Sequence, residues 1–217
     1  MDLNKSTPLH LACRYHSLEC VRLFLQHNAL VYQQDINGNT HLHELARSQQ
    51  STFNESIVYE LLDHAKSSLE IENNEHKTVL SLACEYNHEI LVRLLCNYRT
   101  NVHDCMPFHM AIKSGNINIV ELLLNNHLEL ISMNINGETM VHLACRYNRI
   151  DILKMFLSYR IDIEIRDQQG FTPLLTACSM NHYECVEILL RNQANLYATD
   201  NYERNICKLR FLFSLGK

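Results

Sequence analysis

The chain has 217 residues, and 47% of them are hydrophobic, which is enough apolar material for a continuous core. With only 5 Gly and 3 Pro, few tight turns are available, so we expect a mostly helical fold. The formal net charge of −5, without a long basic cluster, argues against a nucleic-acid partner, and no run of about 18 apolar residues predicts a membrane span.

A fixed period runs through the chain. The hexapeptide HLACRY occurs at residues 10–15 and again at 142–147, a separation of 132 residues, or four times 33. Such a spacing is typical of repeat architectures. Equivalent motif positions stand at Thr7, Thr40, Thr78, Met106, Thr139, Thr172 and Asn205. They predict one domain with repeats at about 2–34, 35–72, 73–100, 101–133, 134–166 and 167–199, and a partial seventh at 200–217.

Each unit starts with a polar turn and a short helix. The Asn-Gly pairs in QDINGN and NINGE suit turns that need a positive φ. The motif Thr is then expected to cap the first helix, and a proline at the first helical position costs no hydrogen bond. These prolines are Pro8, Pro107 and Pro173. The helix is expected to end in a left-handed turn at His16, Asn87, Gly115, Asn148 and Asn181.

A second helix follows in each unit. Apolar residues recur at helical spacing at 20–25, 90–95, 119–124, 152–157 and 185–190. A single unit cannot bury such a stripe, whereas units stacked side by side can.

The motif T-P-L-H-x-A at a period of 33 resembles the ankyrin repeat. STPLHLAC matches it fully, and FTPLLTAC, CMPFHMAI and ETMVHLAC match it in part. The resemblance covers about residues 2–213. It implies an all-α ankyrin-repeat solenoid of helix-turn-helix units joined by projecting β-turns, with about six repeats and a partial seventh. It says little about function, because such arrays bind many unrelated partners.

Three places depart from the period. RSQQSTFNES at 47–56 is inserted between the two helices of repeat two, as either a tolerated surface loop or a contact loop for one partner. The segment 96–109 is shortened, through drift or because it serves as a hinge. The last unit, NICKLRFLFSLGK, stops after about one helix. It is either a truncated final repeat or the sign of a fragment.

The histidines and cysteines favour structure over chemistry. His10, His43, His109 and His142 share one motif position, so they are too far apart for one metal and should bond to neighbouring turns and the Thr cap. We expect His27, His88, His127 and His182 to be solvated in turns. Cys13, Cys84, Cys145 and Cys178 follow the motif Ala and should be small buried residues. No CxxC pair occurs, so we predict no metal and no cofactor.

The sequence predicts no enzyme. It contains no glycine-rich phosphate loop, no GxSxG and no HExxH motif. An odd number of cysteines, 9, without a signal peptide favours free thiols in a reducing compartment, so we expect the cytoplasm or the nucleus.

The resemblance implies that partners meet the exposed side of the first helices and the turn tips. Tyrosines recur at one helix position beside basic residues, and Tyr and Arg are enriched at binding hot spots. The predicted helix contacts are Arg14, Tyr15, Arg47, Glu85, Tyr86, Lys113, Arg146, Tyr147 and Met180; the predicted turn contacts are Ile36, Asn37, Ile135, Asn136, Gln168 and Phe171. In the alternative interpretation, the Arg-Tyr pair is inherited with the duplicated unit and the Tyr packs on the next repeat.

These residues predict a non-catalytic protein-binding module. We expect a monomeric adaptor or competitive inhibitor whose concave face takes an acidic, extended peptide of another protein. Of the turn residues, Ile36, Ile135 and Phe171 are expected to face solvent. The alternative is a binding segment of a larger protein, such as a ligase adaptor, a kinase or a channel, whose effector domain lies elsewhere.

Overall fold

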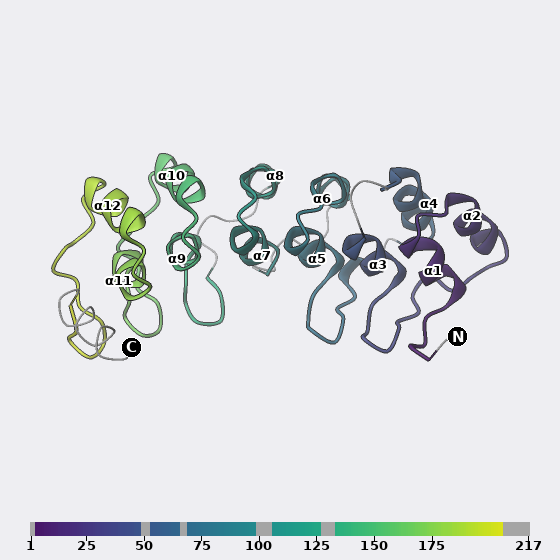
Figure 1. Cartoon of the computed structure of the whole chain (residues 1–217), viewed down its shortest axis with the longest axis horizontal. Helices are drawn as coiled ribbons and strands as arrows, with labels where there is room; N and C mark the ends of the chain where they lie inside the picture. The colour runs from purple at the N-terminus through teal and green to yellow at the C-terminus, as the bar shows by residue number, and fades with distance from the viewer. Residues whose placement is uncertain (1–2, 49–52, 66–68, 99–105, 127–132, 206–217) are drawn as a thin grey trace. The chain divides into compact units, whose positions relative to one another are not determined.

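The computed structural model describes residues 3–48, 53–65, 69–98, 106–126 and 133–205, and these contain twelve helices and no strand. The all-helical prediction is therefore confirmed. The helices come in pairs along the chain (Figure 1). The first helices are α1 (Pro8–Arg14), α3 (His41–Arg47), α5 (Val79–Glu85), α7 (Met106–Ser114), α9 (Met140–Arg146) and α11 (Pro173–Ser179). The second helices are α2 (Leu18–Gln26), α4 (Glu55–Ala65), α6 (Glu89–Asn97), α8 (Ile117–Asn125), α10 (Ile150–Ser158) and α12 (Tyr183–Arg191).

The chain divides into two compact units, residues 1–110 and 111–217. In the N-terminal unit, first helices pack on first helices, α1 on α3 and α3 on α5, while α2 packs on α4. In the C-terminal unit, α9 packs on α11, and α10 packs on both α8 and α12. Each unit thus has a row of first helices and a row of second helices (Figure 1). The boundaries of the individual repeats stay a prediction.

The motif threonines begin the first helices as expected. The Oγ1 atoms of Thr7, Thr78 and Thr172 each accept a bond from the backbone N–H three residues on, at 3.3 to 3.4 Å. Pro8 and Pro173 follow at the first helical position. The third proline differs, because α7 starts at Met106 and Pro107 is therefore its second residue. Neither position needs a backbone N–H for the helix, so the proline is tolerated at both.

A buried histidine joins each of three repeats to the next. Nδ1 of His10 accepts from the backbone N–H of Thr7 at 3.1 Å, and its Nε2 lies 3.1 Å from the carbonyl oxygen of Asn39 in the next repeat. Since Nδ1 accepts, the proton is on Nε2, which donates to the carbonyl. His43 and His142 repeat this geometry, with Nε2 at 3.0 Å from the Lys77 oxygen and 2.9 Å from the Phe171 oxygen. The predicted structural role is confirmed for these three histidines.

An acidic or amide side chain holds each described turn in shape. Oδ1 of Asp35 accepts from the backbone N–H groups of Asn37 and Asn39, both at 2.8 Å. The same pattern occurs at Asn73, Asn134, Asp167 and Asp200, each five residues before the motif position. Their fixed spacing from the motif position is visible in the sequence, but their role in holding the turns follows only from the structure. Neighbouring turns are also bonded to one another, as where Asn74 N donates to Asn37 O at 3.0 Å.

Left-handed backbone occurs at the predicted helix ends. The residues His16, Asn87, Gly115, Asn148 and Asn181 have φ values of 54°, 58°, 85°, 54° and 60°. A second such position lies two residues before the motif, where Gly38 has a φ of 76° and His76 a φ of 56°. Glycine adopts this conformation without steric cost, while a residue with a Cβ is strained there.

The prediction that His88 is solvated is wrong, and the insertion in repeat two is the reason. His88, expected to be solvated, is fully buried, and neither of its ring nitrogens has a hydrogen-bond partner among the described residues. Its ring meets Phe53, the first described residue after the gap at 49–52, with centroids 4.2 Å apart. The Phe53 ring also lies 5.9 Å from the ring of His16. We call Phe53, His16 and His88 the Phe53 cluster.

The insertion explains why His88 differs from its equivalent in repeat six. There, Nδ1 of His182 lies 2.8 Å from the carbonyl oxygen of Cys145, close to the end of the preceding first helix. After α3, the inserted residue Phe53 faces His88 instead. His182 is itself half-buried rather than solvated, whereas His27 is exposed as predicted. His127 lies outside the described residues.

Burial in the Phe53 cluster controls the charge of both histidines. Desolvation lowers the pKa of His88 to about 4, with a smaller effect from the nearby His16, and burial also lowers the pKa of His16. Burial lowers the pKa of His41 to about 4 as well, assisted by His10. Because these folded-state values lie below the unfolded value near 6.5, their stabilising contribution is complete above about pH 6.5 and is lost as the pH falls towards 4.

We expect Phe53→Ala to raise the pKa of His88 towards its ordinary value, because water then reaches the imidazole. The fall in unfolding free energy between about pH 6.5 and 4 should become shallower than in the wild type. NMR titration of His88 and urea unfolding across this pH range measure both effects. Tyr59→Ala, which removes an exposed ring from α4, is the control. An unchanged His88 titration in Phe53→Ala would contradict the role given to Phe53.

We expect Gly38→Ala to destabilise the fold by about 2 kcal/mol. The residue has a positive φ, and an added Cβ would lie only 2.7 Å from the backbone nitrogen of Asn74, whose N–H bonds to the preceding turn. His76→Ala is the matched control, because the equivalent position in the next repeat already carries a Cβ at positive φ, and it should change stability by under about 0.5 kcal/mol. Equal effects of the two substitutions, measured by urea unfolding, would show that the close approach at Gly38 is unimportant.

Candidate functional site

The candidate functional site of the described residues is a surface for binding. No group of three His, Cys, Asp or Glu among them could hold a metal. In the same part of the chain, no helix is long and apolar enough to cross a membrane. The described cysteines are free thiols, and Cys13, Cys84 and Cys145 are buried as predicted while Cys178 is half-buried. The candidate site is therefore the exposed C-terminal ends of the first helices.

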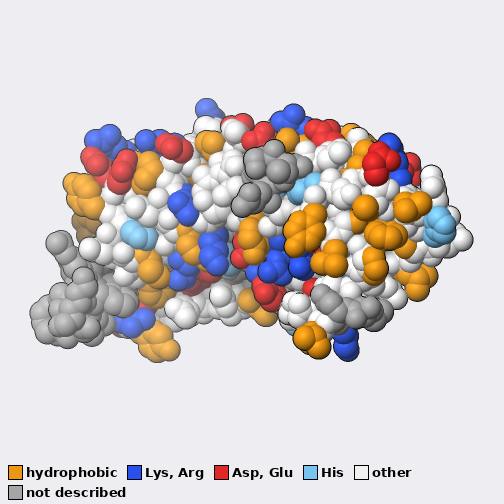
Figure 2. All heavy atoms as spheres, turned by 45° about the vertical axis from the view of Figure 1, so that its right-hand side comes forward, with side chains coloured by type: hydrophobic (Ala, Val, Ile, Leu, Met, Phe, Trp, Pro, Cys, Tyr) orange, Lys and Arg blue, Asp and Glu red, His pale blue; other side chains and the backbone are white. Residues whose placement is uncertain are grey.

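In the N-terminal unit, we call Arg14, Tyr15, Arg47, Glu85 and Tyr86 the first-helix face. Tyr15 and Tyr86 stand at the C-terminal caps of α1 and α5. Their exposed fractions are 75% and 46%, so neither ring is buried against the next repeat. Figure 2, which brings this unit forward, shows hydrophobic and basic side chains gathered together on one side of it. Exposed aromatic rings beside cations are available for a partner.

The C-terminal unit presents the equivalent positions differently. Tyr147, at the cap of α9, is half-buried, and this burial raises its pKa. Met180, at the cap of α11, is exposed. Lys113 is exposed at the end of α7. Of the three recurring tyrosines predicted from the sequence, those of repeats one and three are thus exposed and that of repeat five is half-buried.

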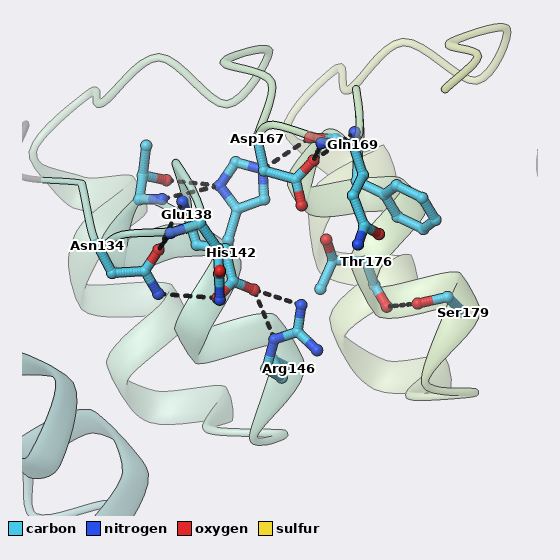
Figure 3. A network of polar contacts seen from close by, with 11 residues as sticks. Asn134, Glu138, His142, Arg146, Asp167, Gln169, Thr176 and Ser179 are labelled. Atoms are coloured by element: carbon cyan, nitrogen blue, oxygen red, sulfur yellow. Dashed lines mark hydrogen bonds and ion pairs between the residues drawn. The ribbon is translucent and has the colours of Figure 1, made fainter. Parts of the chain in front are cut away.

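Two of the four basic residues predicted for the ladder are already neutralised. Nε of Arg14 lies 2.7 Å from Oε2 of Glu44, whose side chain is only 5% exposed. Arg146 forms an ion pair with the buried Glu138 (Figure 3). The other oxygen of Glu138 accepts from the Asn134 amide at 2.8 Å. The prediction that all four basic residues are available to a partner is therefore wrong, because Arg14 and Arg146 form ion pairs with Glu44 and Glu138.

The Glu138–Arg146 pair holds its charge despite burial. Desolvation alone would raise the pKa of Glu138, yet the hydrogen bonds from Asn134 and Arg146 lower it below its ordinary value. The pair joins the residue before the motif Thr to the residue seven positions after it. Repeat three has the same pair with the charges exchanged, Lys77 to Glu85 at 2.8 Å, and Lys77 also meets Glu75 at 2.7 Å.

Repeat two breaks this pattern and leaves a cation free. Its residue before the motif Thr is Asn39, which carries no charge and accepts from the Asn73 amide at 3.0 Å. Arg47, seven positions after Thr40, therefore has no acid at that position to pair with. Glu75 of the next repeat is ion-paired with Lys77, and its pKa is lowered mainly by Lys77 and to a smaller extent by Arg47. It is exposed, and no hydrogen bond or ion pair of its side chain is present in the described part of the chain. Lys113 is likewise exposed and takes part in no ion pair among the described residues.

A pocket lies at the free cation. It has a volume of about 350 Å³ and is lined by Arg14, Asn37, Glu44, Arg47 and Ser48. These residues come from the end of α1, the turn before α3, and α3 with its C-terminal cap. The structure therefore brings three predicted contact residues, Arg14, Asn37 and Arg47, into one hollow.

The predicted turn contacts divide into exposed and structural residues. Ile36 and Ile135 are exposed as predicted, to 51% and 89%. Asn37 and Asn136 are exposed as well, and their carbonyl oxygens accept from the following turn. Gln168 is exposed too, and its amide donates to the Ile135 oxygen at 2.8 Å, so it also joins neighbouring turns.

The prediction that Phe171 faces solvent is wrong. The residue is 8% exposed rather than solvent-facing, and it belongs to a buried cluster with Leu175 and Ala198. The reason is its register: it directly precedes the motif Thr172, the place that the buried residues Asn39 and Glu138 take in their repeats. The tip of that turn lies further back, before Gly170, which has the positive φ.

The sequence matches the family description "Ankyrin repeats (3 copies)" at residues 1–67, 50–134 and 127–200. The chain belongs to the ankyrin repeat family. Ankyrin repeats are protein–protein interaction modules, and their fold is generally a non-catalytic binding scaffold. The fold is also similar to the human ASB11 ankyrin repeat domain, with a TM-score of 0.80, 22% identity and 98% coverage of both chains. For the ankyrin repeat domain of Bcl-3 the TM-score is 0.78 at 20% identity, covering 99% of this chain and 100% of that one.

Curated relatives share ankyrin sequence over part of their length. The chain is 34% identical over 135 residues to ankyrin repeat protein FPV031 of Fowlpox virus, covering 57% of this chain and 38% of that protein. It is 30% identical over 143 residues to Tyrosine-protein kinase HTK16 of Hydra vulgaris, covering 61% and 18%. It is 26% identical over 129 residues to human Transient receptor potential cation channel subfamily A member 1, covering 57% and 11%. Its matches therefore span 11% to 38% of these relatives.

We expect Glu138→Gln to lower the unfolding free energy by about 1 to 3 kcal/mol at pH 7, because Arg146 loses its charged partner at a buried site. Glu85→Gln, in the more exposed equivalent pair with Lys77, should cost under about 1 kcal/mol. Because the pKa of Glu138 is lowered on folding, its contribution is present above about pH 4.5 and is lost below, so the difference between wild type and Glu138→Gln should shrink there. A difference that stays constant from pH 7 to 3.5 would contradict this account.

Proposed function

We propose that this ankyrin repeat chain binds a partner protein through the first-helix face of its N-terminal unit. The observation that carries the proposal is the unpaired Arg47 between two exposed tyrosines, Tyr15 and Tyr86, in consecutive repeats. Elsewhere on the equivalent helices, Arg146 is paired and Tyr147 is half-buried. The partner segment is acidic and extended, since it crosses several helix ends and meets a free cation.

The role is that of a non-catalytic adaptor or competitive inhibitor acting as a monomer in the cytoplasm or nucleus. Lys113 and Met180 supply secondary contacts on the C-terminal unit, and Ile36 and Ile135 supply apolar contacts at the turns. Arg14 contributes as a residue held in place by Glu44, while Arg146 and Phe171 serve the fold.

A second candidate is that the chain is the binding segment of a larger protein. The partial coverage of a kinase and of a channel subunit favours it, because in both relatives the matching sequence is a minor part of the whole. In that case the first-helix face keeps its role, and the activity resides in sequence beyond this chain.

We expect the double variant Tyr15→Ala/Tyr86→Ala to lose partner proteins that the wild-type chain retains from cell lysate. The matched control is Tyr183→Ala/Tyr197→Ala, which removes two tyrosines that are 77% and 84% exposed on the C-terminal unit. Recovery measured by quantitative mass spectrometry should fall at least about tenfold for the first pair and stay unchanged for the second. Circular dichroism checks that both variants fold. Equal recovery by wild type and the Tyr15/Tyr86 variant would exclude the first-helix face.

A further inference from the structure

We propose that the pocket lined by Arg14, Asn37, Glu44, Arg47 and Ser48 binds one aspartate or glutamate carboxylate of the partner. We call it the Arg47 pocket. The inference rests on the proposed function and names the chemistry by which the partner is anchored on the first-helix face.

The accessible groups of the Arg47 pocket are hydrogen-bond donors. The Arg47 guanidinium is exposed and forms no hydrogen bond or ion pair in the described part of the chain. Arg14 donates to Glu44 through Nε, and within that part no hydrogen bond of its terminal nitrogens is present. The Asn37 side chain is exposed at the rim. Two guanidinium groups can therefore meet the two oxygens of one carboxylate, the geometry that arginine favours.

The acids near the pocket are already engaged. The charge of Glu75 interacts chiefly with Lys77, at 2.7 Å, and only to a smaller extent with Arg47. Glu44 is buried and occupied by Arg14. Asp35 is also buried, and its Oδ1 accepts from the backbone N–H groups of Asn37 and Asn39. The exposed charge of the pocket is thus the single positive charge of Arg47, because the charge of Arg14 is balanced by Glu44. A monovalent carboxylate neutralises it, whereas a phosphate dianion would leave a net negative charge in the site.

Repeat five shows how the arginine at the position of Arg47 is paired when the repeat supplies its own acid. In repeat five, Glu138 occupies Arg146, and Asn134 donates to the second oxygen of Glu138. Repeat two has Asp35 and Asn39 at those two positions. Asn39 is buried and carries no charge, so the partner's carboxylate would supply to Arg47, from the pocket, the negative charge that Glu138 supplies to Arg146. This comparison also supplies a variant that fills the pocket without removing Arg47.

That variant is Asp35→Asn/Asn39→Glu, which copies the Asn134 and Glu138 pair of repeat five into repeat two. The new glutamate is expected to pair with Arg47 and to block the pocket from within. Arg47→Ala removes the cation itself. Lys154→Ala is the matched control, because it removes one exposed positive charge from α10 in the C-terminal unit.

The test uses a phage-displayed random peptide library selected on the immobilised full chain. Peptides selected on wild type should share an aspartate or glutamate at one fixed position. Replacing that residue by Asn or Gln should weaken binding to wild type and to Lys154→Ala at least about tenfold, and should weaken binding to Arg47→Ala less than about twofold. Asp35→Asn/Asn39→Glu should behave as Arg47→Ala does, with thermal unfolding showing that both variants fold. Arg47→Lys, which keeps the charge, should retain part of the preference for the acid.

The outcomes separate this inference from the proposed function. Peptides that depend on Tyr15 and Tyr86 but share no acidic position would overturn the Arg47 pocket and leave the first-helix face standing. An acidic position whose effect persists in Arg47→Ala would overturn the pocket as well. Peptides that need both Arg47 and their acid, but bind equally to Tyr15→Ala/Tyr86→Ala, would support the pocket and overturn the wider face.

Discussion

The architecture depends on an imidazole that bonds in two directions. In His10, His43 and His142, one ring nitrogen accepts from the N–H of the motif threonine and the other donates to a carbonyl oxygen of the next repeat. The first bond fixes the start of a helix, and the second fixes the distance to its neighbour. Only the neutral ring can make both, because a protonated Nδ1 would face a donor. Helix capping and repeat stacking are thus one event, which is why units too small to fold alone can form an ordered row.

The sequence predicts well whatever lies inside one unit. Threonine caps, left-handed helix ends and apolar stripes each depend on residues a few positions apart, so a repeated motif reveals them together. The errors arose where a side chain finds its partner in another repeat. Arg14 resembles Arg47 in the sequence, and only the nearby Glu44 of the next repeat distinguishes them. Phe171 is the exception, because its register against Thr172 inside its own repeat decides its burial more than its position near a turn does.

The same contrast explains why the binding face could be predicted only in part. Recurring tyrosines and arginines point to the first helices, and the structure leaves Tyr15 and Tyr86 exposed there. Which cations remain available depends in part on the residue before the motif Thr, which is Ser6, Asn39, Lys77, Glu138 and Phe171 in successive threonine-capped repeats. Asn39 is an amide, and its neutrality leaves Arg47 unpaired. The charges at the two paired positions of a repeat can be read from the sequence. That these two positions pair is known only from the structure.

The Phe53 cluster has a consequence for how the N-terminal unit unfolds. In an ordinary array each repeat contacts only its immediate neighbours, and stability is close to a sum over adjacent pairs. Phe53 belongs to repeat two, yet its ring lies against His16 of repeat one and His88 of repeat three. One side chain of the insertion therefore contacts both neighbours of repeat two, and besides desolvation the nearby His16 of repeat one lowers the pKa of His88 of repeat three. Losing any one of the three repeats weakens contacts of the other two. The first three repeats should consequently behave as a single cooperative block, which does not fray from its end one repeat at a time.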